Sequence, residues 1–178
     1  FLNRLINSRR YAAVYDEGLK LNLTKRKTAT WEEITGVTAI TIQPYFFRLH
    51  LPPSQTGILY YSNGETIKIR DNITDSKGLL SEIKARVYPV LIKRFKHDFV
   101  SGEKLSFGPI GIDKQHFLLT NDKSGQNQAY NWQQIKQIDL QSGNLMIEFR
   151  DYPSKRIPAA EIPNIELMLQ LIKSEISV

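Results

Sequence analysis

The sequence contains no cysteine among its 178 residues. This absence excludes disulfide bonds, thiolate metal sites and cysteine nucleophiles, and it is typical of a protein from a reducing compartment. No apolar run in the sequence approaches the roughly 20 residues that a helix needs to cross a bilayer, and we expect no signal peptide. We therefore expect a soluble cytoplasmic protein, placed at the cytosolic face of a membrane if an anchor precedes Phe1.

Motifs for catalysis are also missing. The three histidines, His50, His97 and His116, do not have the spacing of metal ligands. There is no Gly-x-Ser-x-Gly elbow, phosphate-binding loop or dinucleotide fingerprint. His97 and Asp98 are neighbours in sequence, but a solvated polar pair after a helix explains them better than a catalytic dyad. We predict that the protein is not an enzyme, uses no metal or cofactor and has no small-molecule substrate.

What the chain does contain is an internal repeat. A Trp-x-x-Ile block occurs at residues 31–34 and again at 132–135. Gly18 leads into the first block and Gly111, by a longer route, into the second. Because the two tryptophans occupy equivalent places in both copies, we predict that each is a core anchor between its sheet and a helix.

The segments after each block support the same division. Residues 65–71 and 144–151 are alternating strands that both close on Arg-Asp, and an apolar helical pattern follows each, at about 75–97 and 163–176. We predict a β-rich α+β chain with units 1–100 and 101–178 that meet near 100–103. The first unit is longer, with two further strands at 45–51 and 57–61. Pro89 should kink or interrupt the first helix.

A family resemblance rests on residues 11–19, the two Trp-x-x-Ile blocks, residues 107–112 and residues 162–164. These stretches resemble the DUF6585 group, an uncharacterised bacterial family of tandem pleckstrin-homology-like domains, over nearly the whole chain. The resemblance implies two split β-barrels, each closed by its C-terminal helix. It implies no established ligand.

The basic charge is concentrated in the first unit. Residues 1–100 hold 16 Lys plus Arg against 9 Asp plus Glu, whereas residues 101–178 hold 8 against 9. Lys25, Arg26 and Lys27 are expected in the loop before the strand that leads to Trp31, with Arg9 and Arg10 nearby in sequence. Such a loop could bind anionic head groups, at about 1 kcal/mol for each cation, although a solvated turn explains it as well. Other cations are dense on the predicted helix, at Arg86, Lys93, Arg94 and Lys96.

One strand places an aromatic residue beside charge. On residues 45–51, Phe46 and Arg48 share the face opposite to that of the apolar residues. We predict that Phe46 and Arg48 contact a partner, which could be a second unit, a subunit or a membrane surface. Packing under the turn that follows is the alternative for Phe46.

Three function classes follow from these observations. A module for protein partners or self-association is the first, because sheet edges readily accept a peptide strand. The second is a peripheral or juxtamembrane module that binds anionic lipid through the basic loop. Nucleic-acid binding is the third and weakest, since no stretch interleaves aromatic and basic residues.

Overall fold

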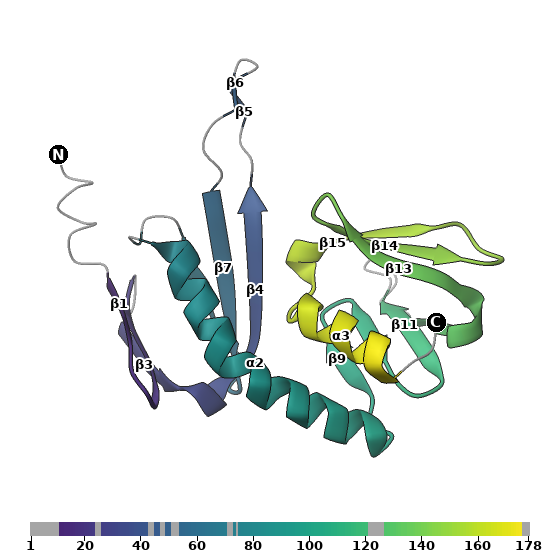
Figure 1. Cartoon of the computed structure of the whole chain (residues 1–178), viewed down its shortest axis with the longest axis horizontal. Helices are drawn as coiled ribbons and strands as arrows, with labels where there is room; N and C mark the ends of the chain where they lie inside the picture. Colours follow the sequence, from purple (N-terminus) through teal and green to yellow (C-terminus); the bar gives the residue numbers. More distant parts are fainter. Residues whose placement is uncertain are drawn as a thin grey trace. The chain divides into compact units, whose positions relative to one another are not determined.

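The computed structural model describes residues 11–23, 26–42, 45–46, 49–50, 54–70, 73, 75–120 and 127–175. This part of the chain has a β-rich α+β fold with antiparallel sheets and two α-helices (Figure 1). The chain divides into two compact units, Phe1–Val90 and Leu91–Val178. The division therefore falls inside helix α2 (Ser76–Val100) and not at the turn near 100–103 that the sequence predicted.

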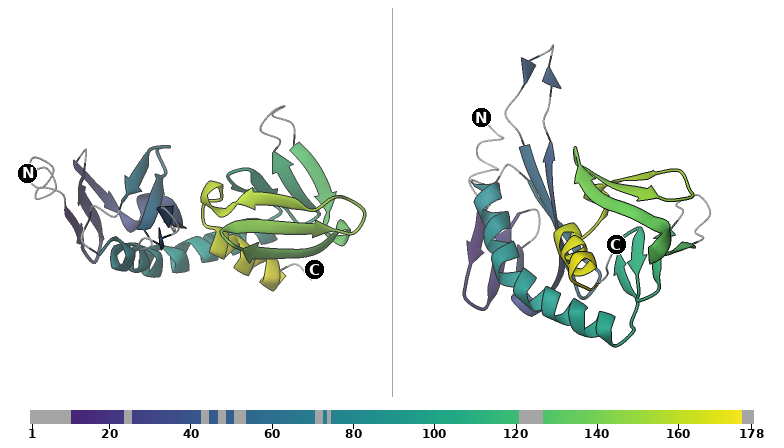
Figure 2. Two further views of the ribbon diagram at one scale, coloured as in Figure 1. Left: turned by 90° about the horizontal axis from the view of Figure 1, so that it is seen from above. Right: turned by 45° about the vertical axis from the view of Figure 1, so that its right-hand side comes forward.

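Unit 1 contains two three-stranded sheets and a two-stranded ribbon. The first sheet has the order β1-β2-β3, from β1 (Tyr11–Val14), β2 (Gly18–Asn22) and β3 (Arg26–Thr30). After the short 3-10 helix η1 (Trp31–Glu33), the second sheet has the order β4-β7-β8, from β4 (Ile34–Ile42), β7 (Ser54–Tyr61) and β8 (Thr66–Ile69). The ribbon pairs β5 (Tyr45–Phe46) with β6 (Leu49–His50) at the end of the β4–β7 hairpin (Figure 2).

Unit 2 repeats the two-sheet plan, and its first sheet has four strands where that of unit 1 has three. Its first sheet has the order β12-β11-β10-β9, from β9 (Leu105–Phe107), β10 (Ile110–Ile112), β11 (His116–Thr120) and β12 (Asn127–Asn131). The 3-10 helix η2 (Trp132–Gln134) leads to the sheet β13-β14-β15, from β13 (Ile135–Gln141), β14 (Asn144–Phe149) and β15 (Lys155–Pro158). The 3-10 helix η3 (Ala159–Glu161) and helix α3 (Ile165–Glu175) end the unit.

Helix α2 contributes to both cores. Leu80, Ile83 and Val87 belong to the apolar helical pattern predicted at about 75–97 and are buried, whereas Val90 of the same pattern is exposed. Further along, Phe99 is buried in the core of unit 2 and the ring of Phe95 meets that of Phe107 edge-on, with centroids 5.3 Å apart. Because one helix carries apolar side chains for two cores, contacts of unit 2 begin before the predicted boundary.

Both helices begin at a residue in the left-handed region. Asp75 has φ 55° and caps the first turn of α2, since its Oδ1 accepts a hydrogen bond from the Gly78 N–H at 2.9 Å; the sequence offers Asp75 or Ser76 as the cap. Asn164 has φ 54° at the start of α3, and Pro163 precedes it outside the helix. Of the two effects predicted for Pro89, a kink or an interruption, the interruption does not occur, because helix α2 continues through this residue. Pro89 removes one backbone donor, which a long helix with many other hydrogen bonds tolerates.

Both units contain the repeat, but the Arg-Asp match predicted from the sequence joins two strands that are not equivalent. The Arg-Asp match pairs β8 with β14, whereas in the structure β14 pairs with β13 as β7 pairs with β4. Both hairpins have a register shift at their start, at Ile34/Gly36 and at Ile135/Gln137. The strand β8 therefore corresponds to β15. The match of residues 65–71 with 144–151 is wrong because neighbouring strands of one sheet show the same alternation of apolar residues.

The tryptophans are equivalent in their hydrogen bonds and different in their burial. Trp31 Nε1 donates to the Asp16 carbonyl at 2.8 Å, and Trp132 Nε1 donates to the Asp113 carbonyl at 2.9 Å. Trp132 is 9% exposed and belongs to the core of unit 2, so its predicted role is confirmed. Trp31 is only half-buried, so the prediction of twin core anchors is wrong for it.

Candidate functional site

The residues of the predicted basic loop either belong to a strand or lie outside the part of the chain that the structure describes. Arg9, Arg10 and Lys25 lie outside the residues that the structure describes. Arg26 and Lys27 are the first residues of strand β3, because β3 pairs with β2 from the Asn22–Arg26 pair onward. Arg26 is exposed. Lys27 alternates with it and shares the inward face of β3 with the buried Ala29.

Lys27 is held by unit 1 itself. Its ammonium lies 4.4 Å from the centroid of the Tyr61 ring and forms an ion pair with Glu65. The hairpin turn positions Glu65, whose carboxylate accepts a hydrogen bond from Asn63 Nδ2 at 3.0 Å. The side chain of Lys27 is 23% exposed. A head group would therefore have to compete with Glu65 for Lys27, so this cation contributes less to a lipid site than the sequence predicted.

Tyr61 is the unusual member of this cluster. It is 4% exposed, and its hydroxyl has no hydrogen-bond partner within the described part of the chain. Burial, together with smaller contributions from the negative charges of Glu33 and Glu65, raises the pKa of Tyr61 to about 12. The phenol is therefore protonated at neutral pH and could not act as a base.

Of the two predicted partner contacts, Phe46 belongs to β5, with its side chain outside the described part of the structure, and Arg48 lies wholly outside the described residues. Strands β4 and β7, which precede and follow β5 in the sequence, pair from Ile34–Tyr61 to Ile42–Ser54. Strand β8 accompanies β7 only from Gly57 to Tyr60. Beyond that point residues 40–42 and 54–56 form a ribbon with no third strand among the described residues.

We call the described residues 40–42, 45–46, 49–50 and 54–56 the arm. It extends from the β4–β7 hairpin and carries the β5–β6 ribbon at its end (Figure 1). The corresponding hairpin of unit 2 has no such extension, because Gln141 pairs directly with Asn144 across a turn of Ser142 and Gly143. These two residues have φ 48° and 75°, which is the geometry of a tight two-residue hairpin. The prediction of a single strand over residues 45–51 is wrong, because β5 and β6 within this range pair with each other as antiparallel strands. The predicted strand at 57–61 forms the second part of β7.

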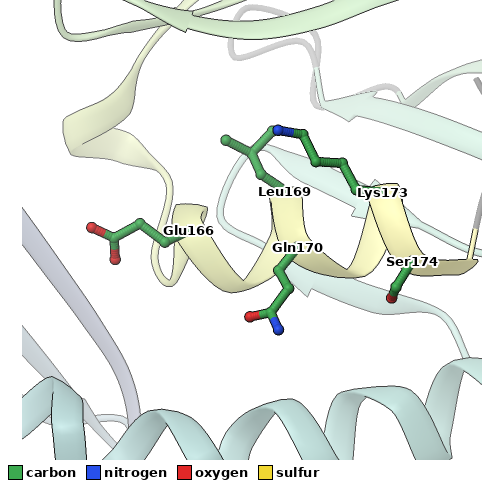
Figure 3. A pocket seen from close by; sticks show the side chains of 5 residues that line it. All are labelled: Glu166, Leu169, Gln170, Lys173 and Ser174. Atoms are coloured by element: carbon green, nitrogen blue, oxygen red, sulfur yellow. The ribbon is translucent and has the colours of Figure 1, made fainter.

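Little else in the described residues has the composition of a reactive site. No group of three or more His, Asp or Glu side chains there is arranged to hold a metal ion. One depression is lined by residues of α3 alone: Glu166, Leu169, Gln170, Lys173 and Ser174. Leu169 and Lys173 point to one side of the helix and Gln170 and Ser174 to the other (Figure 3). These side chains do not include a nucleophile paired with a base.

Comparison with known proteins gives a family but no activity. A family model described as DUF6585, a family of unknown function, matches residues 1–177. The chain belongs to the DUF6585 family. No curated protein matches it. Among the described residues of this DUF6585 chain, no helix combines the length and apolar character needed to cross a membrane.

Proposed function

We propose that this DUF6585 chain is a non-catalytic binding module that takes up a β-strand from a protein partner or from a second copy of itself, through the arm. The observation that carries the proposal is the ribbon of residues 40–42 and 54–56, whose outer edges have no neighbouring strand in the described part of unit 1. Unpaired backbone N–H and C=O groups at such edges accept an added strand.

The energetics of a two-stranded ribbon support this assignment. A hairpin of two strands is at best marginally stable in water, because it lacks a sheet face or a third strand. A strand that adds to it would supply the missing ladder. The arm is therefore a segment for which binding provides stability that the chain alone does not.

Composition distinguishes the arm from the equivalent part of unit 2. Strand β4 contains no charged residue, whereas its counterpart β13 carries Lys136 and Asp139. Charges on an outer strand oppose pairing with other chains. The edge formed by β13 in unit 2 is therefore protected by charge, and the edge formed by β4 in unit 1 is not.

The proposed binding module is built from two pleckstrin-homology-like units. In unit 2, a four-stranded sheet, a three-stranded sheet and a closing helix follow one another, which supports such a fold. Unit 1 has the same order without a counterpart of β9 in its described residues. A peptide-binding role is compatible with this scaffold because its sheets are open at their outer strands.

The test is to shorten the arm to the turn of unit 2. Residues 42–54 are replaced by Ser-Gly, so that Thr41 and Gln55 flank the turn as Gln141 and Asn144 do in the other unit. Sedimentation velocity over a concentration series measures self-association. Selection of random peptides on the immobilised chain measures strand addition from another protein. We expect affinity to fall more than about ten-fold, or about 1.4 kcal/mol, with little change in melting temperature.

The matched control is Leu140→Ser, which removes an exposed apolar side chain from the hairpin of unit 2. It should bind as the parent does. A shortened chain that selects the same peptides and self-associates equally well would show that the arm is not the binding element.

A further inference from the structure

We propose that the outer face of the last turns of helix α2 docks on an anionic membrane surface. This face, called the basic face below, consists of Lys93, Arg94, His97 and Val100. All four residues are exposed and all belong to unit 2. The proposal is independent of the arm, which lies in unit 1.

The packing of α2 determines which side of the helix is free. Leu91 and Phe99 are buried and Phe95 is half-buried, at a spacing of four residues, so this row faces the protein. Lys93, His97 and Val100, at spacings of four and three residues, lie on the opposite side, and Arg94 flanks them. The basic face is therefore a single surface of one helix.

The cations of the basic face are available to a ligand. Within the described residues, Lys93 and Arg94 take part in no ion pair, whereas Lys27, Arg86 and Lys136 are each paired with a carboxylate. A further cation lies at the helix end, where Lys114 Nζ donates to the Val100 carbonyl at 2.6 Å. The nearby acids are Asp98, 3.3 Å from the His97 ring nitrogen, and the exposed Glu103.

The mixture of charge and apolar surface indicates a bilayer as the occupant. Val100 is 59% exposed at the end of the row of cations. A lipid surface would receive both parts, since phosphates meet the cations and the acyl region accepts the valine. A nucleic acid would use the cations and leave Val100 in water. The attraction is electrostatic in part, so it must weaken as salt is added.

The experiment is flotation of the full chain with phosphatidylcholine vesicles that contain or lack phosphatidylglycerol. The double variant Lys93→Ser with Arg94→Ser should bind the anionic vesicles about 25-fold more weakly, from about five-fold for each cation. The matched control is Lys155→Ser with Arg156→Ser, which removes two exposed cations from strand β15 of the same unit. The control should bind as the parent does, and both variants should melt as the parent does.

A third variant separates lipid from nucleic acid. Val100→Ser should weaken vesicle binding by a few-fold, because apolar surface no longer enters the bilayer, and should leave binding to duplex DNA unchanged. The proposal is overturned if the parent does not float with anionic vesicles, if both charge variants lose binding equally, or if Val100→Ser binds vesicles as the parent does. The chain with the shortened arm should still float, so failure of one proposal leaves the other intact.

Discussion

Trp132 offers the sharpest test of how unit 2 is held together. Its indole is 9% exposed, meets the Phe117 ring edge-on with centroids 5.8 Å apart, and donates to the Asp113 carbonyl at 2.9 Å. Trp132→Ala removes the ring from a core that cannot close around the cavity, at a cost of about 3–5 kcal/mol. Trp132→Phe keeps most of the ring and loses one hydrogen bond, at about 1 kcal/mol.

Urea unfolding followed by fluorescence and by circular dichroism measures both variants, and the two units can unfold separately. For a domain of this size, 1 kcal/mol lowers the melting temperature by about 4–8 °C. Trp31→Ala is the internal comparison, because Trp31 makes the equivalent hydrogen bond to Asp16 and is only half-buried. Trp31→Ala should lower the free energy of unfolding clearly less than Trp132→Ala does. Equal costs would refute the reasoning, since burial would then not determine the effect.

Two further predictions concern unit 1. Gly18→Ala should destabilise unit 1 by more than about 2 kcal/mol in thermal melts, because an added Cβ would lie 2.2 Å from the Ala29 carbonyl oxygen. Gly64→Ala meets no neighbour and should cost less, about 1 kcal/mol, which comes from its positive φ of 80°. Tyr61→Phe should raise stability at neutral pH by about 1 kcal/mol, because it removes a buried hydroxyl without a partner. The parent should lose stability as pH rises from about 10 to about 12, since the unfolded tyrosine ionises first. This loss should be smaller in Tyr61→Phe, with the remainder due in part to Tyr130, whose pKa burial also raises. An unchanged alkaline loss would contradict the raised pKa of Tyr61.

The candidate surfaces were predicted less well than the elements. The sequence identified Lys25, Arg26 and Lys27 as one cluster, but strand pairing turns Lys27 inward toward Tyr61 and Glu65. The neighbours of an ionic side chain come from distant segments, and spacing along the chain does not reveal them. The cations of α2 were visible in the sequence, yet only the burial of Leu91 and Phe99 showed which of them face outward.

The amino-acid sequence by itself determined the classes of element, because these depend on local periodicity and capping. Two units with the order strands then helix, the Trp-x-x-Ile blocks and the Asp75 cap follow from residues close together in the chain. Only the tertiary structure decided which strands pair, that β14 corresponds to β7, and that the two units divide within α2. Pairing depends on long-range backbone hydrogen bonds that any alternating strand can make. The division of the chain into two units depends on which core each turn of α2 contacts. The apolar residues of that helix are compatible with the core of unit 1 and with that of unit 2, so the sequence does not decide between them.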